Sequence, residues 1–250
     1  MHISLDGKTA LVTGASSGLG ERFAIRLAES GARVALAARR IDKLDALKAR
    51  IQSAGGQAYT VAMDVTQVES VSAAIDAIEH DFGTIDILVN NSGVSVTKKL
   101  GSYTEADYDY VMNTNTKGAF FVAQTVGARM VQRGGGRIVN IASAAGIHVL
   151  PLIAVYSMSK AAVVQMTKAM AREWGRAGVT INALCPGYIE TEINRDHWQT
   201  DAGQRLIQKL PRRRVGQPQD LDGLLMVLVS DASNFINGAA ILVDDGLSLG

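Results

Sequence analysis

Short apolar runs alternate with longer stretches of helical periodicity along almost the whole chain. The runs are rich in valine, isoleucine and alanine and short enough to be buried strands. They predict strands at residues 8–13, 33–38, 58–63, 85–89, 137–142, 179–184 and 240–243. Between them, apolar residues recur every three or four positions. This spacing predicts helices at residues 19–30, 43–54, 68–82, 106–132, 156–174 and 220–229, the fourth of them capped by Thr104.

The alternation of strands and helices determines the fold class that we expect. Parallel strands joined through helices need right-handed crossovers, which place helices on both faces of the sheet. We therefore predict an α/β fold in which residues 1–250 form one doubly wound domain with a seven-stranded, mostly parallel sheet. Residues 188–217 do not fit the alternation, because they are polar and long for a connection. Connections of this kind are often functional, and we interpret this one as a lid over the substrate.

A glycine-rich motif lies between the first predicted strand and the first predicted helix. Its glycines follow the spacing Gly-x-x-x-Gly-x-Gly. Glycines let the backbone turn tightly and approach a pyrophosphate, and the N-terminus of the following helix attracts negative charge. The motif therefore predicts a dinucleotide site that contains Gly14, Ser16, Ser17, Gly18, Leu19 and Gly20.

The end of the second strand indicates which dinucleotide binds. An acidic residue there would accept a hydrogen bond from the ribose of NAD, whereas an arginine suits the 2′-phosphate of NADP. No acidic residue occurs between Val34 and Ile41, and the strand runs out at Arg39 and Arg40. A guanidinium offers a planar fork of donors to a phosphate. We therefore predict NADP(H) as the cofactor, with Arg39 as the main phosphate contact and Arg40 and Ser16 as lesser ones. A pair of surface arginines is the alternative.

Asp64 and Val65 follow the third predicted strand, at the same edge of the sheet. The carboxylate of Asp64 would hold the edge of the adenine, with Val65 beside it in the cofactor site. The alternative for Asp64 is an N-cap of the next helix, a position that favours aspartate. Both interpretations stay open at the level of sequence.

A possible catalytic group lies at the start of the predicted helix 156–174. Tyr156 and Lys160 are four residues apart and share one helix face. A phenol with a pKa near 10 is a poor acid or base at neutral pH, and we expect the ammonium of Lys160 to lower the pKa of Tyr156. Ser143 follows the strand 137–142, where its hydroxyl would hold the substrate oxygen or cap the next segment. Asn115 is a polar residue in an apolar stretch. Its side chain would either hold a water molecule near Lys160 or form a hydrogen bond with a helix carbonyl.

Composition narrows the class of protein further. The chain has 25 basic and 24 acidic residues and a net charge of +1, so it lacks the basic excess of a nucleic-acid-binding protein. The three arginines at 212–214 are interpreted as a solvated loop. One cysteine and four histidines without ligand spacing predict neither an internal disulfide nor a metal site. The sequence contains no signal layout and no apolar stretch of membrane length, and we expect a cytoplasmic protein without membrane contact.

In this order, the motifs resemble those of the classical short-chain dehydrogenase/reductase family over essentially the whole chain, including its 3-oxoacyl-acyl-carrier-protein reductases. The residues that carry the resemblance are the glycine motif, Asp64, Asn90, Asn91, Ser92, Gly93, Asn115, Ser143, Tyr156, Lys160, Pro186 and Gly187. The resemblance implies a Rossmann-type fold and a homotetramer. It also implies that Tyr156 is the acid/base, that Lys160 additionally binds the nicotinamide ribose, and that Ser143 positions the substrate. Asn115 would complete the proton relay.

The same resemblance extends the predicted cofactor site to Asn91, Ser92, Gly93, Tyr156, Lys160, Pro186, Gly187, Ile189 and Thr191. Two positions depart from the family pattern. Ser92 stands where the family usually has alanine, and the C-terminal Asp-Gly-Gly reads Asp244-Asp245-Gly246. Neither departure touches the predicted catalytic tetrad of Asn115, Ser143, Tyr156 and Lys160.

Together these features predict hydride transfer between NADP(H) and a small ketone or secondary alcohol. One alternative is a 3-oxoacyl-acyl-carrier-protein reductase, which would need a basic surface near its site for an acidic carrier; the candidates are Arg129, Arg133, Arg172 and residues 212–214. Another is a dinucleotide-binding regulator without catalysis, which the intact tetrad disfavours. By position, the substrate pocket should contain Ser143, His148, Leu150, Ile153, Tyr188, Ile193, His197 and Trp198.

Overall fold

A computed structural model of the chain describes residues 3–192 and 194–249. These residues contain a seven-stranded sheet in the order β3-β2-β1-β4-β5-β6-β7, in which all neighbouring strands are parallel. The strands are β1 (Thr9–Thr13), β2 (Arg33–Ala38), β3 (Gln57–Ala62), β4 (Ile87–Asn90), β5 (Gly136–Ile141), β6 (Val179–Pro186) and β7 (Ala240–Val243). The predicted α/β fold with its parallel sheet is confirmed, and no strand end moves by more than two residues.

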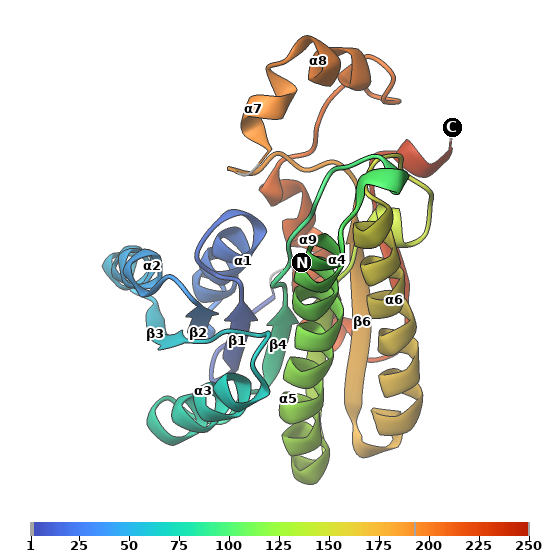
Figure 1. Cartoon of the computed structure of the whole chain (residues 1–250). Coiled ribbons are helices and arrows are strands. Elements are labelled where there is room, and N and C mark those ends of the chain that lie inside the picture. The colour runs from blue at the N-terminus through green and yellow to red at the C-terminus, as the bar shows by residue number, and fades with distance from the viewer. Residues whose placement is uncertain (1–2, 193, 250) are drawn as a thin grey trace.

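Helices pack on both faces of the sheet (Figure 1). One face carries α1 (Gly18–Glu29), α2 (Ile41–Ser53) and α9 (Asp222–Leu228), and the other carries α3 (Val68–Asp81), α5 (Ala119–Arg133) and α6 (Ala154–Trp174). Each helix contributes an apolar stripe to the layer that it covers, as its periodicity predicts. The strand order reverses between β1 and β4, which is where a doubly wound sheet opens a crevice at its carboxyl edge.

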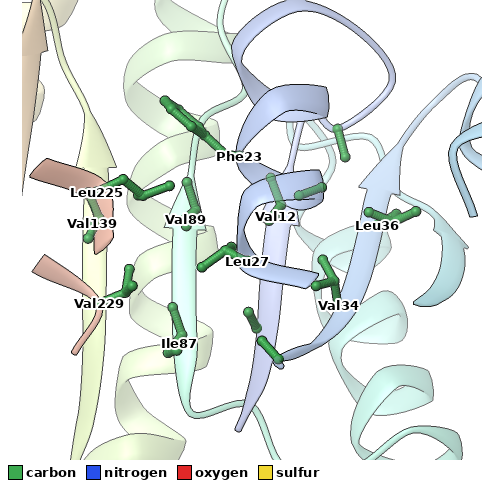
Figure 2. Packing of buried hydrophobic residues seen from close by; sticks show 14 of the residues in the cluster. Val12, Phe23, Leu27, Val34, Leu36, Ile87, Val89, Val139, Leu225 and Val229 are labelled. Carbon is green, nitrogen blue, oxygen red and sulfur yellow. The ribbon is translucent and has the colours of Figure 1, made fainter. Parts of the chain in front are cut away.

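Figure 2 shows the apolar layer between α1 and the sheet. Phe23 and Leu27 of α1 pack in one buried cluster with Val12 of β1 and Val89 of β4. All four side chains are buried, so α1 is held firmly against the strand that precedes it. This packing fixes the N-terminus of α1 at the carboxyl end of β1, in front of the crevice.

The predicted helix over residues 106–132 is interrupted in the structure. Thr104 caps α4 (Glu105–Met112) as predicted, in a reciprocal arrangement with Asp107. A π-helical turn (Asn113–Gly118) then follows before α5 begins. At Gly118 a Cβ atom would lie 2.8 Å from the carbonyl oxygen of Val65, so this turn packs against backbone too closely for a side chain. Apolar periodicity does not reveal a π turn, because the pattern before and after it still looks helical.

The unassigned stretch 188–217 contains two short helices that the sequence pattern did not predict. They are α7 (Arg195–Trp198) and α8 (Asp201–Ile207), and both stand beyond the carboxyl ends of the strands (Figure 1). Thr200 starts α8 by accepting a hydrogen bond from the backbone of Gly203. From residue 3 to residue 249, Ile193 aside, no helix has the length and apolar character needed to cross a membrane.

Candidate active site

The glycine-rich loop turns directly from β1 into α1. Gly14 and Gly18 have φ angles of +65° and +59°, which glycine adopts without strain. A Cβ atom at Gly20 would lie 2.3 Å from the carbonyl oxygen of Gly14, so only glycine fits the close packing of helix and loop. The loop therefore leaves the first N–H groups of α1 facing the crevice, a suitable position for a phosphate.

Asn91, just after β4, holds this loop in place. Its backbone N–H donates to Thr13 Oγ1 (2.9 Å) and its side-chain amide donates to the carbonyl of Thr13 (3.0 Å). The backbone N–H of Ser92 donates to the same threonine hydroxyl (3.1 Å). Gly93 lies deeper, where a Cβ atom would be 3.4 Å from the ammonium nitrogen of Lys160. Residues 91–93 thus connect the predicted cofactor loop with the predicted catalytic group.

The two arginines after β2 differ in position. Arg40 Nη2 donates to the hydroxyls of Ser16 (2.9 Å) and Ser17 (2.8 Å), so its guanidinium lies on the glycine-rich loop. Arg39 is exposed at the end of the strand. The sequence favoured Arg39 over Arg40, whereas the structure brings Arg40 onto the loop. Both remain within the basic edge that is suited to a 2′-phosphate.

Asp64 belongs to a turn rather than to a helix cap. Its Oδ1 accepts hydrogen bonds from the backbone N–H (3.0 Å) and the hydroxyl (2.8 Å) of Thr66. The helix α3 begins at Val68 with Gln67 as its N-cap, so the capping alternative for Asp64 is wrong. Val65 is buried against the π turn at Gly118.

Tyr156 and Lys160 lie on the first turns of α6, as predicted, with the Lys160 nitrogen 5.7 Å from the centre of the tyrosine ring. The side chain of Lys160 is 4% exposed and its nitrogen donates to the carbonyl of Ile141 at the end of β5 (2.7 Å). Ser143 follows β5 and is buried, and its hydroxyl accepts from the backbone N–H of Ala145 (3.1 Å). Ser143 and the pair Tyr156 and Lys160, predicted from two different elements, therefore meet at the end of β5.

Burial dominates the electrostatics of this group. It lowers the pKa of Lys160 to about 8, with a small opposing effect from the buried thiol of Cys185. Burial also raises the pKa of Tyr156, and the hydrogen bond with Ser143 only partly opposes this. The sequence predicted a lowered tyrosine pKa, and that direction is wrong for the protein's own groups. The reason is that the desolvation of the phenolate outweighs what the surrounding side chains offer it.

Asn115 sits on the π turn and is 1% exposed. Its side chain accepts from the backbone N–H of Val94 (2.8 Å) and donates to the carbonyl of Val94 (2.9 Å) and the hydroxyl of Ser159 (3.0 Å). It therefore bonds a neighbouring loop and not a carbonyl of its own helix. Ser159, which also donates to the carbonyl of Tyr156 (2.6 Å), was missed by the sequence reasoning. In the sequence, Ser159 is marked only by its place on the predicted helix between Tyr156 and Lys160.

The predicted cofactor residues Gly187, Ile189 and Thr191 come from the segment after β6. Thr191 lies over the glycine loop, because a Cβ atom built on Gly18 would be 3.6 Å from the Cβ atom of Thr191. The backbone N–H of Gly187 donates to Val243 at the end of β7 (3.0 Å), which fixes the start of the segment. Ile189 is buried and bridges in parallel to Gly216.

The predicted substrate residues fall into two groups. His148, Leu150 and Ile153 share the loop between β5 and α6. Tyr188, His197 and Trp198 form an aromatic group at the start of the segment 188–217, with ring centres 5.4 Å apart for Tyr188 and Trp198 and 5.1 Å for His197 and Trp198. Ile193 lies outside the described residues. Over residues 3–192 and 194–249, the structure contains no group of three or more His, Cys, Asp or Glu side chains placed to bind a metal ion.

The fold and the site together define a class of protein. A glycine-rich loop at the switch point of a parallel sheet, next to a tyrosine and a buried lysine, is the arrangement of an oxidoreductase that uses a nicotinamide dinucleotide. The family model of the short chain dehydrogenases matches residues 8–202. The chain belongs to the short-chain dehydrogenase/reductase family.

Similar proteins in this family act on different substrates. The chain is 42% identical over 250 residues to gluconate 5-dehydrogenase of Gluconobacter oxydans (strain 621H), covering 98% of this chain and 96% of that one. It is 33% identical to a 3-oxoacyl-[acyl-carrier-protein] reductase of Thermotoga maritima, covering 97% and 98%. The crystal structure of a gluconate 5-dehydrogenase from Burkholderia cenocepacia J2315, in complex with NADP and tartrate, superimposes with a TM-score of 0.95 at 39% identity, covering 100% and 98%.

Proposed function

We propose that the protein transfers a hydride between NADP(H) and a ketone or secondary alcohol, with Tyr156 as the acid and base. The observation that carries the proposal is the cluster of Tyr156, Ser143 and Lys160 at the crevice beside the glycine-rich loop, in which the serine and the lysine are buried. When bound, the nicotinamide supplies or accepts the hydride. The side chains do the rest: they hold the oxygen of the substrate and move its proton.

The cofactor site is suited to a dinucleotide phosphate. The tight turn at Gly14 and Gly18, with no room for a side chain at Gly20, gives a cradle for the pyrophosphate at the start of α1. Arg40, anchored on Ser16 and Ser17, and the exposed Arg39 would bind the 2′-phosphate. Between Val34 and Ile41 the chain has no carboxylate to compete for those donors. Thr191 and Ile189 would cover the nicotinamide end.

The raised pKa of Tyr156 has a direct consequence for the chemistry. At neutral pH the phenol is protonated, so it is ready to give its proton to the oxygen of a ketone as that oxygen gains negative charge. Ser143 would hold the same oxygen through its hydroxyl. Lys160 would bind the nicotinamide ribose, and Asn115 would connect it to the proton relay. In the direction of oxidation, Tyr156 must first lose its proton, which the positive charge of the oxidised ring would favour.

For the substrate class we propose a small polyhydroxylated alcohol or acid such as D-gluconate. The similarity to two gluconate 5-dehydrogenases supports this class, and so does the mixed group of aromatic and imidazole side chains near the site. Indole and imidazole N–H groups can hydrogen-bond to hydroxyl oxygens while their rings pack on carbon.

A carrier-protein substrate is less well supported, because the required basic surface is largely neutralised or distant. Arg129 pairs with Asp76 and Glu79, and Arg133 pairs with Glu79 (3.0 Å). Both arginines lie near the C-terminal end of α5, away from α7 and α8 (Figure 1). Arg172 is in the last turn of α6, also far from the lid. Of the arginines at 212–214, two form ion pairs with aspartates.

Two further properties are proposed with this function. The segment 188–217 would act as a lid on a single catalytic domain, because its helices stand over the site and carry its aromatic residues. The chain would also assemble as a homotetramer. The exposed Tyr110, Phe120 and Met158 on α4, α5 and α6 give these helices an apolar outer surface, which supports association between copies.

The proposal is tested with the purified full chain and a panel of substrates. The panel contains D-gluconate with NADP⁺ or NAD⁺, simple secondary alcohols, and a 3-oxoacyl thioester with NADPH, followed by the absorbance of the reduced nicotinamide. We expect oxidation of D-gluconate with NADP⁺ and its loss in Tyr156→Phe. Turnover of the thioester alone would favour the carrier-protein reductase. Dinucleotide binding without turnover of any substrate would favour the regulator.

A further inference from the structure

In the turn that follows β7, Asp245 adopts a left-handed backbone conformation. Asp245 has a φ of +56°, in the left-handed region that glycine adopts freely and other residues adopt at a cost. Arg213, whose neighbours Arg212 and Arg214 pair with Asp245, has a φ of +50°. Strained positions of this kind persist only where surrounding interactions hold them.

The carboxylate of Asp245 faces two arginines from the end of the segment 188–217. Arg212 Nη1 lies 3.0 Å from Asp245 Oδ1, and Arg214 Nε lies 3.5 Å from Asp245 Oδ2. Arg214 also pairs with Asp220 through Nη1 (2.8 Å). Asp220 accepts in turn from the backbone N–H of Gln217 (2.8 Å). The turn after β7 is thus joined by charge to the C-terminal end of the proposed lid.

Backbone hydrogen bonds join this end of the lid to its beginning. Gly216 N–H donates to the carbonyl of Tyr188 (2.9 Å), and Glu190 N–H donates to the carbonyl of Gly216 (2.8 Å). The beginning is itself fixed on β7, through the hydrogen bond from Gly187 to Val243 (3.0 Å). Whatever holds residues 214–216 therefore also holds Tyr188, the first aromatic residue of the substrate group.

The same region is not tightly packed. A cavity of about 160 Å³ lies between the two ends of the lid and the turn after β7, lined in part by Tyr188, Leu210, Pro211, Asp245 and Leu247. A close-packed joint would be held by contacts throughout its interior. Because this joint contains a cavity, its ion pairs carry more of the task of keeping the two ends of the lid in position.

We propose that Asp245, Arg212 and Arg214 form an ion-pair latch that fixes both ends of the lid and thereby positions Tyr188 against the substrate. Asp245 is a positioning residue in this scheme and touches neither substrate nor cofactor. The proposal rests on the proposed function in one respect, the role of Tyr188 at the substrate. The latch itself is a property of the protein alone and can be measured without any substrate.

The test uses Asp245→Asn. Asparagine has the same size as aspartate, lacks its charge and also tolerates a positive φ. Arg213→Gln is the matched control: it removes one charge from the same run, and Arg213 makes no ion pair within residues 3–192 and 194–249. Hydrogen exchange at Glu190 and Gly216 reports the joint. A partly exposed ion pair contributes a factor of roughly 2–5, so losing two should speed exchange by about four- to 25-fold. Arg213→Gln should change it by less than about twofold.

Three further measurements complete the experiment. Raising the salt concentration should speed exchange in the unmodified protein and have little effect in Asp245→Asn, because salt screens the pairs. The double variant Asp245→Asn with Arg212→Gln should exchange no faster than Asp245→Asn with Arg213→Gln. The KM for D-gluconate should rise by a factor similar to the exchange, with the Kd for NADPH and the urea midpoint nearly unchanged.

Equal exchange in Asp245→Asn and Arg213→Gln would overturn the latch. Faster exchange with an unchanged KM would overturn the positioning role of Asp245. If the unmodified protein does not oxidise D-gluconate, the proposed substrate class fails, and the exchange and salt measurements still decide whether the latch exists.

Discussion

Replacement of Lys160 by methionine should make the protein more stable while abolishing its activity. Burial lowers the pKa of this lysine from 10.5 to about 8, so the folded protein binds its proton less tightly than the unfolded chain does. At about pH 7 the proton is bound in both states, and the folded state carries the full cost of a buried charge. One pKa unit corresponds to about 1.4 kcal/mol, which gives a cost of about 3 kcal/mol near neutral pH.

The sign of the pH dependence follows from the same shift. Between the folded and unfolded pKa values the unfolded chain binds more protons, so stability rises with pH across that window. From about pH 7 to about pH 9.5, the free energy of unfolding of the unmodified protein should gain about 2 kcal/mol relative to Lys160→Met. The window ends below pH 10, the ordinary tyrosine pKa, because burial raises the pKa of Tyr156 in the folded protein and the unfolded chain therefore loses that proton first, which reverses the trend.

Urea denaturation of both proteins without added nucleotide, at each pH, measures this difference. Lys168→Met is the matched control, because it removes an exposed lysine from the same helix. The control should show no pH-dependent difference from the unmodified protein. A Lys160→Met variant that is less stable at neutral pH, or whose pH profile parallels that of the unmodified protein, would refute the reasoning. NADPH-dependent turnover, measured alongside, should be lost in Lys160→Met and kept in Lys168→Met.

Four other predictions test the site. Tyr156→Phe should lower turnover by about 10²–10⁴-fold and leave NADPH binding nearly unchanged, since only the proton is lost; near-normal turnover in a folded variant would falsify the mechanism. Alcohol oxidation should speed up as the pH rises, because burial raises the pKa of Tyr156 and the base form is scarce at neutral pH; a flat alkaline pH–rate profile contradicts this. Arg39→Ala and Arg40→Ala should each reduce the preference for NADPH over NADH by about tenfold or more, since a charge-assisted hydrogen bond contributes roughly 1.5–3 kcal/mol; an unchanged ratio of kcat/KM values argues against a 2′-phosphate contact. Gly20→Ala places a Cβ atom 2.3 Å from the backbone of the loop and should abolish dinucleotide binding in a fluorescence titration, whereas Gly101→Ala, with nothing within 4 Å, should not.

The sequence predicted the sheet well because its strands are short and mostly apolar, and the inner strands β1, β2 and β4 are buried on both faces. Strands of this kind, such as β2 (Arg33–Ala38), contrast strongly with the helices around them. The helix over 106–132 was predicted as continuous because a π turn adds one residue without changing residue types. The turn is associated with the close packing of Gly118 on Val65. These residues are 53 positions apart (118 − 65), so no local sequence pattern encodes their contact.

The candidate site shows the same division. The residues that meet at the end of β5 could be chosen from sequence because their types and order are distinctive. Their electrostatics could not, since the pKa of Tyr156 depends on how deeply the fold buries the phenol. The choice between Arg39 and Arg40 likewise depends on which side chain points back to Ser16 and Ser17, and adjacent residues at a strand end point in different directions.

The π turn makes the middle of this chain unusually sensitive to length. A regular α-helix advances by about 100° per residue, so deleting one residue between 113 and 118 would let the helix rejoin as an ordinary one. Because a π turn takes up one extra residue over about the same rotation, the deletion would keep α4 and α5 close to their present orientation and change no apolar side chain in either. Asn115 would turn away from Val94 and lose its bonds to that loop. A laboratory search for shortened variants should therefore recover well-folded, inactive proteins from these six positions.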